Sequence, residues 1–135
     1  MVNRTLKFKI FDTRAKKIIN RIDCVIDTNG EGIQSFNKSG VIEGTLRNRH
    51  LIPLQYAERK DMTDKEIYDG YIIKREYQIP VGKDIIGVVE CFECAWWIVN
   101  HKEQRAEKLF DEIAIDIIIG NRWENEKLLE ELNIE

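Results

Sequence analysis

Short segments in which apolar and polar residues alternate, separated by turn residues, dominate the first hundred positions of the chain. In the first segment, Leu6, Phe8 and Ile10 alternate with two lysines, which is the pattern of a strand with one buried face. A turn over residues 12–16 leads to a second alternating segment, residues 18–26, so we expect an antiparallel hairpin. No segment before residue 100 keeps helical periodicity. The pattern predicts a mostly β fold.

Turn signals divide the following residues into further strands. Asn29-Gly30 readily adopts the positive φ of a tight hairpin, and a weaker strand follows over residues 33–36. Gly70 interrupts the apolar strand expected over residues 67–73 and indicates a bulge or a tight bend, by which a small barrel turns a corner. Other strands are expected over residues 51–56, 86–91, 95–99 and 115–119, with Phe92-Glu93-Cys94 as the turn between the second and third of these.

The apolar period changes to 3.6 residues after Lys102. A short amphipathic helix of about three turns is expected there, with one face formed by Ala106, Leu109, Phe110 and Ile113. Asn125 is a suitable N-cap for a last helix, whose apolar face consists of Leu128, Leu129 and Leu132. We expect that helix to dock on the core. The alternative is that its narrow apolar stripe binds a partner.

The composition is that of a folded protein. The 135 residues fit one domain, and an apolar fraction of 43% supports a core. No apolar run approaches the roughly 20 residues that cross a bilayer, and the first residues lack the apolar centre of a signal peptide. Three cysteines, an odd number, make no disulfide framework and suit a reducing compartment. We therefore expect a cytoplasmic protein that does not bind a membrane.

Charge is unevenly distributed along the chain. Residues 1–60 contain 12 Lys and Arg and 6 Asp and Glu, a net charge of +6, whereas residues 61–135 contain 9 and 18, a net charge of −9, which together give the total of −3. A basic half can bind nucleic acid, with phosphate contacts from Arg47, Arg49, Arg59 and Lys60. We favour attraction between the halves, within one fold or across an oligomer, because no basic run exceeds two residues.

No set of residues has the spacing of a catalytic or metal centre. Cys91 and Cys94 have the spacing of half a zinc site, but a second close pair of cysteines or histidines is missing. Nothing in the spacing links His50 or His101 to a serine or cysteine nucleophile, and the chain has no glycine loop of the phosphate-binding kind. We therefore expect a protein that is not an enzyme and holds no metal and no cofactor.

Two neighbouring tryptophans supply the candidate binding surface. On a strand, Trp96 and Trp97 point to opposite faces, so at least one lies off the main core unless a helix covers it. We favour coverage by the C-terminal helix; an exposed tryptophan would instead anchor a peptide or an unstacked base. Of these two ligands, the acidic second half disfavours nucleic acid. The candidate partner-binding residues are Trp96, Trp97, Tyr71, Arg47 and Arg49.

Several motifs occur in a fixed order along the chain. They are Lys7-Phe8-Lys9-Ile10-Phe11-Asp12, Leu54-Gln55-Tyr56, Lys65-Glu66-Ile67-Tyr68-Asp69-Gly70, Gly87-Val88-Val89-Glu90, and Ile119-Gly120-Asn121-Arg122-Trp123-Glu124-Asn125 followed by Leu128-Leu129. Together they resemble the YopX family. The resemblance implies a small protein of phages and prophages, chiefly in Gram-positive bacteria, whose main domain is an SH3-like β-barrel. It supplies no catalytic residues to transfer.

The chain departs from the family pattern around the polar turn at residues 57–65. Family members usually have Tyr-Thr-Gly-Leu where this chain has Tyr56-Ala57-Glu58-Arg59, and Asn-Gly where it has Thr63-Asp64. They have Gly-Asp where it has Gly70-Tyr71, and Asn-Pro where it has Asn125-Glu126, a mild change because Glu suits the first turn of a helix nearly as well as Pro. The first two departures bear on the shape of the turn.

These patterns predict an SH3-like small β-barrel with an N-terminal β-hairpin extension and a C-terminal helix. We divide the chain into a hairpin region, residues 1–49, and a barrel with its helix, residues 50–135, which can also form one compact domain. The expected function is that of a non-enzymatic interaction or regulatory module, encoded by a phage or prophage, that binds a protein of host or phage or associates with itself. Nucleic-acid binding through the basic first half is the alternative.

Overall fold

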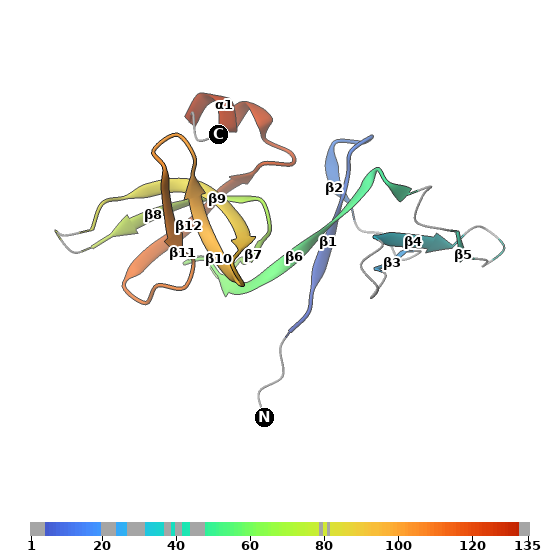
Figure 1. Cartoon of the computed structure of the whole chain (residues 1–135), viewed down its shortest axis with the longest axis horizontal. Helices are drawn as coiled ribbons and strands as arrows, with labels where there is room; N and C mark the ends of the chain where they lie inside the picture. Colours follow the sequence, from blue (N-terminus) through green and yellow to red (C-terminus); the bar gives the residue numbers. More distant parts are fainter. Residues whose placement is uncertain are drawn as a thin grey trace.

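A ten-residue strand, β6 (Leu51–Lys60), connects the two ends of the molecule (Figure 1). The computed structural model describes residues 5–19, 24–26, 32–36, 39, 42–43, 48–78, 80 and 82–132. Within these residues the chain forms twelve strands and one helix. The other strands are β1 (Phe8–Asp12), β2 (Lys17–Ile19), β3 (Cys24–Ile26), β4 (Ile33–Phe36), β5 (Ile42–Glu43), β7 (Glu66–Tyr68), β8 (Tyr71–Tyr77), β9 (Ile85–Phe92), β10 (Ala95–Asn100), β11 (Arg105–Lys108) and β12 (Ala114–Asn121), and the helix is α1 (Glu126–Leu132).

The N-terminal hairpin is confirmed, but it is shorter than expected. β1 and β2 pair antiparallel across the turn at residues 13–16, in which Asp12 Oδ1 accepts hydrogen bonds from the amides of Arg14 and Ala15. The expectation of one strand over residues 18–26 is wrong, because β3 pairs with β4 in a different, three-stranded sheet. Alternation of side chains does not reveal where a chain passes from one sheet to another. The predicted Asn29-Gly30 turn lies outside the described residues.

The buried face of β1 is the opposite of the expected one. Leu6 is 66% exposed and Phe8 40%, whereas Phe11 is buried. The two lysines share the face of Phe11 and cover aromatic rings of the barrel: Lys7 Nζ lies 5.6 Å from the ring centroid of Tyr56, and Lys9 Nζ lies 4.8 Å from that of Tyr68. Long basic side chains can bury their stems on aromatic surface while the charge stays in water, so a lysine-bearing face need not be the solvent face.

β6 belongs to both ends of the molecule. It pairs with β1 through Leu51–Gln55 and with β7 between Tyr56 and Lys60, which gives a four-stranded sheet of order β2-β1-β6-β7. The register shifts between Tyr56 and Lys60, where Glu58 has a φ of 58°. The hairpin region and the barrel therefore share this strand. The division of the chain at residue 50 stays a prediction.

The barrel half is a five-stranded antiparallel sheet of order β11-β10-β9-β8-β12. Its open side, between β12 and the end of β6, is bridged by two hydrogen bonds: the Met62 amide donates to Asp116 O, and the Ile118 amide donates to Asp61 Oδ2. Gly70, with a φ of 83°, separates β7 from β8, so the strand expected over residues 67–73 bends sharply there. The mostly β class, with a curled half-barrel sheet and one C-terminal helix, is confirmed.

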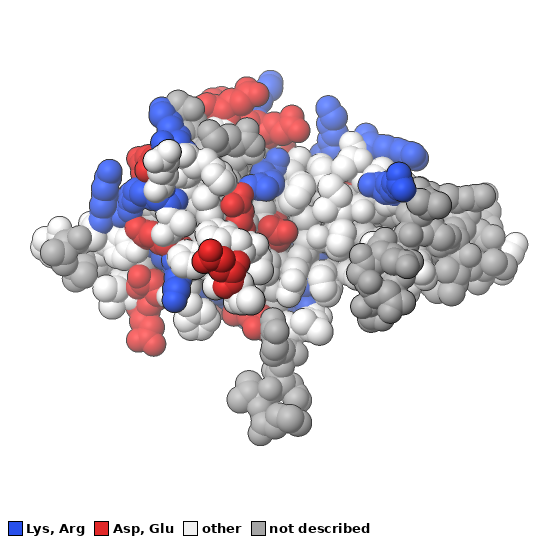
Figure 2. All heavy atoms as spheres, viewed as in Figure 1, with Lys and Arg blue, Asp and Glu red and all other residues white. Residues whose placement is uncertain are grey.

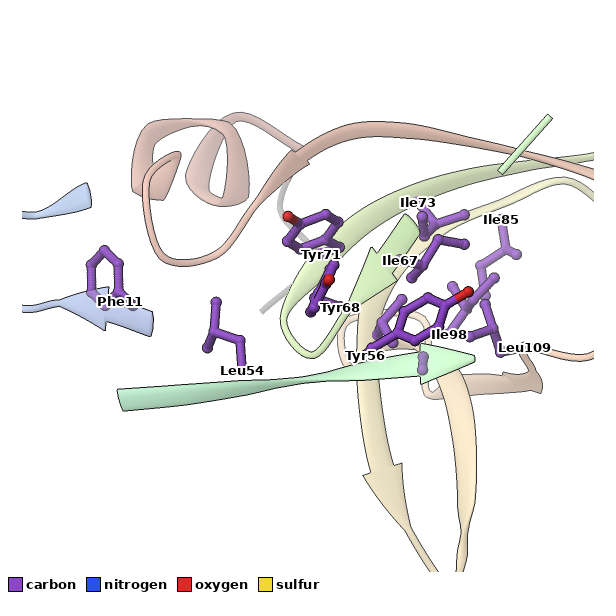
Figure 3. Packing of buried hydrophobic residues seen from close by; sticks show 12 residues of the cluster. Phe11, Leu54, Tyr56, Ile67, Tyr68, Tyr71, Ile73, Ile85, Ile98 and Leu109 are labelled. Atoms are coloured by element: carbon purple, nitrogen blue, oxygen red, sulfur yellow. The ribbon is translucent and has the colours of Figure 1, made fainter. Parts of the chain in front are cut away.

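The core runs without interruption from the N-terminal hairpin into the barrel. Figure 3 shows Phe11 and Leu54 at one end and Ile67, Ile85 and Ile98 at the other, with tyrosines between them. A smaller cluster on the other face of the barrel sheet joins Ile72, Val88 and Leu129, with Ile86, Leu128 and Leu132 packed against it. The helix α1 therefore docks on the core, as expected. No helix in the described part of the chain is long and apolar enough to span a bilayer.

The prediction of a helix after Lys102 is wrong. Residues 101–104 form a turn, in which Gln104 has a φ of 53°, and β11 follows as an edge strand beside β10. Of the supposed apolar face, Leu109 is buried in the barrel, whereas Phe110 is 74% exposed and Ile113 57%. The 3.6-residue spacing was coincidental. An edge strand that reads Arg-Ala-Glu-Lys has no apolar alternation by which it could have been found.

Candidate functional site

Phe92 and Trp97 form a stacked pair of aromatic rings on the outer face of the β9–β10 hairpin. The ring centroids lie 5.0 Å apart and the ring planes differ by 12°. Trp97 Nε1 donates a 3.0 Å hydrogen bond to Phe92 O, which fixes the indole relative to the strand end. Phe92 is 39% exposed, and Lys108 Nζ lies 5.9 Å from the Trp97 ring. We call Phe92 and Trp97 the aromatic pair.

The two tryptophans lie on opposite faces of β10, as the sequence predicts. Trp96 packs against the barrel core, whereas Trp97 lies directly opposite Glu90 on the outer face. The helix α1 covers Ile72 and Val88 on that face and does not cover Trp97, contrary to our expectation. The tight turn that brings the pair together has positive φ at Glu93 (49°) and Cys94 (61°), the backbone of a two-residue hairpin loop.

A groove of about 710 Å³ adjoins the aromatic pair at Glu90 and separates the outer face of the hairpin from α1. Directly opposite residues of neighbouring strands have Cβ atoms about 5 Å apart, so Trp97 and the groove form one surface. The groove is lined by Glu90, His101, Arg122, Trp123, Glu126, Leu129 and Glu130.

Arg122 and Glu90 form the charged wall of the groove. Arg122 Nη2 donates to Glu90 Oε1, and His101 Nε2 lies 3.4 Å from the same oxygen. Arg122 Cζ also lies 5.8 Å from the ring centroid of Trp123. Beneath them, burial raises the pKa of the Asp69 carboxyl; the Arg122 charge opposes this effect and the Glu90 charge adds to it. Arg122 Nη2, Glu90 and His101 thus contact one another, whereas Arg122 Nε is buried without a hydrogen-bond partner.

Tyr71 contributes to the interior and not to the groove. It is 7% exposed, and its ring centroid lies 5.7 Å from that of Tyr68, which in turn lies 5.5 Å from that of Tyr56. Lys9 Nζ donates a 3.1 Å hydrogen bond to the Tyr71 hydroxyl. Burial and then the nearby Glu66 carboxylate raise the pKa of Tyr68 to about 12, so the Tyr68 hydroxyl in the middle of this row stays neutral. It joins β1 to the barrel.

The basic candidates lie away from the aromatic pair. Arg49 is exposed just before β6, and Arg47 lies outside the described residues. Arg59 is engaged inside the molecule, since its guanidinium donates to Asp111 O and stacks 5.0 Å from the Phe110 ring. Figure 2 shows basic side chains over the β1–β2 hairpin and acidic side chains over α1. Among the described candidates, the structure therefore does not bring Tyr71 and Arg49 together with the tryptophans.

Cysteine and histidine side chains remain separate in the described part of the chain. Cys91 and Cys94 are exposed and free, and Cys24 is partly buried on β3. Among the described residues, no group of three or more His, Cys, Asp or Glu side chains is arranged to hold a metal ion.

Sequence reasoning missed Phe92, Glu90 and Arg122. A two-residue turn at Glu93-Cys94, in place of the expected turn over residues 92–94, would have placed Glu90 opposite Trp97 and Phe92 at the end of the strand.

Comparison with known proteins identifies the family. A family model described as YopX protein matches residues 7–130. The chain belongs to the YopX family. The resemblance of the sequence motifs is thereby confirmed. A search of curated proteins finds no match.

Two solved structures share the YopX-family fold of this chain. The protein yopX from Bacillus subtilis superposes with a TM-score of 0.58 at 18% identity, over 90% of this chain and 96% of that one. The protein EF1440 from Enterococcus faecalis gives a TM-score of 0.57 at 16% identity, over 94% and 99% of the two chains. At this level of identity the likeness concerns the fold alone.

The YopX-family pattern also explains an unusual turn. Family members usually have glycine at the positions of Glu58 and Asp64, and both residues have positive φ here, 58° and 67°. Glycine takes this left-handed conformation freely, whereas other residues do so at a cost. At these two positions the chain therefore adopts a backbone conformation that glycine would take at lower cost.

Proposed function

We propose that this chain is a non-enzymatic interaction module that binds a protein partner through the aromatic pair and the adjoining groove. The observation that carries the proposal is the stacking of the exposed Phe92 ring on the half-buried Trp97 ring beside a groove. A phage or prophage setting, which the family resemblance implies, and a cytoplasmic location are parts of the same proposal.

The aromatic pair is suited to binding because it is partly exposed and held in place. The hydrogen bond from Trp97 Nε1 to Phe92 O and the stacking of the rings restrict both side chains before a partner arrives. Large aromatic side chains that lose little rotational freedom on binding contribute much of the energy of protein interfaces. The two-residue turn at Glu93 and Cys94 keeps the pair on a rigid hairpin.

A protein is the better ligand for this surface than a nucleic acid. Glu90, Glu126 and Glu130 line the groove, and Glu93 is exposed in the hairpin turn. Phosphates bind where Lys and Arg neutralise them, and carboxylates repel them. The one arginine in the lining, Arg122, is paired with Glu90 and so is already engaged by a carboxylate.

The test is selection from a library of random peptides displayed on phage, with the purified chain as bait. We expect the wild type to enrich a consistent set of peptides, and Phe92→Ala and Trp97→Ala to lose them. Phe110→Ala is the matched control, because Phe110 is an exposed aromatic residue away from the pair. Failure of the wild type to enrich any peptide, or unchanged enrichment with Trp97→Ala, would contradict the proposal.

Nucleic-acid binding through the N-terminal hairpin is the second candidate. It is favoured by one observation, the basic side chains over the β1–β2 hairpin, where Arg14, Lys16 and Lys17 are exposed (Figure 2). A gel shift whose affinity falls steeply with added salt, and which Lys16→Ala and Lys17→Ala weaken, would support it. Absence of a shift at low salt would remove this candidate.

A further inference from the structure

Two carboxylates of the groove have no counter-charge within the described part of the chain. Glu90 is paired with Arg122, but no hydrogen bond or ion pair joins Glu126 or Glu130 to any described residue. Both side chains line the groove, and both residues are exposed. Arg122 is the one fully charged basic side chain in the lining at neutral pH, so the groove as a whole is acidic.

The positions of these carboxylates are unfavourable for the helix that carries them. Glu126 and Glu130 are four residues apart on α1, where side chains of like charge face and repel each other. Glu130 also lies near the C-terminal end of α1, where the helix dipole disfavours negative charge, and the last turn contains no basic residue. Glu126 suits the helix dipole in the first turn of α1, but the helix gains nothing from Glu130. A positive charge brought into the groove would relieve both repulsions.

The rest of the lining fits the stem of a long basic side chain. The Trp123 ring provides apolar surface between the charged groups, whereas Leu129, which also lines the groove, is only 3% exposed. Lys and Arg bury their methylene stems on such surface while the charged head reaches carboxylates beyond it. A compact metal ion would not use this apolar surface, and the absence of a third free carboxylate in the lining leaves few oxygen ligands for it.

We propose that the groove is the subsite for a lysine or arginine side chain of the protein partner. This inference rests on the proposed function, since the same partner places an apolar side chain on the aromatic pair. Trp97 and the groove meet at Glu90, and an extended peptide advances about 3.3 Å per residue. The basic residue therefore lies about one to four residues from the apolar one in the partner's sequence.

The experiment repeats the peptide selection with the double variant Glu126→Gln, Glu130→Gln. Glu131→Gln is the matched control, because Glu131 lies on the same helix but outside the groove. One peptide enriched by the wild type is then synthesised with its basic residue intact and with that residue replaced by glutamine. Binding of both peptides to all three proteins is measured by fluorescence anisotropy at low and physiological salt.

The expected result is that wild-type peptides carry Lys or Arg at a constant distance from an apolar residue. The double variant should bind the basic peptide about fivefold more weakly and the glutamine peptide unchanged, with Glu131→Gln like the wild type. Thermal unfolding of the free double variant should show no loss of stability, which excludes a folding defect. Peptides that depend on Trp97 but show no basic preference would overturn this inference and leave the proposed function standing. If no peptide is enriched at all, both fail.

Discussion

Arg75 on β8 and Asp116 on β12 form a buried, two-bond ion pair inside the barrel. Arg75 Nε donates to Asp116 Oδ1 at 2.7 Å and Nη2 donates to Oδ2 at 2.8 Å, with Arg75 0% exposed. The same guanidinium donates to the carbonyl oxygens of Lys108 and Leu109. It thus ties the irregular chain after β11 to the barrel wall.

Replacement of Arg75 by Met should lower the free energy of unfolding by about 3–5 kcal/mol, because the buried Asp116 carboxylate then keeps only the longer contact of 3.7 Å with Arg59 Nε. The double variant Arg75→Met, Asp116→Leu should recover much of this loss, since it removes both charges. Urea unfolding, monitored by tryptophan fluorescence, measures the free energy of unfolding of both variants. If the free energy of unfolding of Arg75→Met lies within about 1 kcal/mol of the wild-type value, the ion pair is not required for stability.

Gly70→Ala should destabilise the chain by about 2–4 kcal/mol. A Cβ at Gly70 would lie 2.2 Å from Trp123 Nε1, which donates to Asp69 O, and the φ of 83° disfavours any side chain. Gly32→Ala is the control, because Gly32 also has a positive φ, 111°, but open space around its Cβ. Gly32→Ala should lose only the backbone contribution of about 1 kcal/mol. Equal losses in a thermal unfolding comparison would mean that the contact with Trp123 does not matter.

Asp64→Gly should leave stability unchanged or raise it by up to about 1 kcal/mol, because glycine relieves the strain of the 67° φ and loses only entropy and a weak surface pair. Asp64→Val should cost about 1–2 kcal/mol by the same reasoning. Met62→Gly is the control at a neighbouring exposed position that does not have a positive φ, and it should destabilise. Differential scanning calorimetry ranks the three variants by stability. If Asp64→Gly is less stable than Asp64→Val, the positive φ of Asp64 is not a source of strain.

Acid should destabilise the fold partly through Asp61. Burial by itself raises the pKa of this carboxyl, but hydrogen bonds from the Ile118 amide, Thr63 and the Lys65 amide outweigh it and lower the pKa below the ordinary value of 3.8. A lowered folded-state pKa stabilises the fold above the unfolded value, and this contribution is lost as pH falls through the folded pKa. Unfolding free energies between pH 2 and about 6 should therefore fall less steeply for Asp61→Asn than for the wild type. If the unfolding free energies of the two proteins change with pH at the same slope, Asp61 does not contribute to the acid destabilisation.

Strands with apolar residues on at least one regular face could be predicted from the sequence, and strands without them could not. β10 and β12 lie where Ala95–Val99 and Ile115–Ile119 predicted them. β6 continues four residues beyond the predicted end at Tyr56, because its last residues pair with β7 while carrying polar side chains. β11 was mistaken for a helix for the same reason.

The candidate site could be predicted only in part. Alternation along one strand predicts that Trp96 and Trp97 point to opposite faces, and this prediction is confirmed, but alternation does not tell which of them lies on the outer face. Its partner Phe92 was assigned to a turn, although it is the last residue of β9, so the stacked pair stayed hidden. Arg122 reaches Glu90 across 32 positions of sequence. Contacts of that kind depend on how the strands are ordered in the sheet, which no local pattern encodes.

The hairpin region and the barrel share β6, which makes these two halves of the protein hard to separate by cloning. A fragment that starts at residue 50 would keep Leu51–Gln55 but lose β1, and so would display a bare row of backbone amides and carbonyls. Such rows recruit strands from other molecules. Precipitation of that fragment would thus reflect the missing neighbour, and would say nothing about whether the barrel is sound.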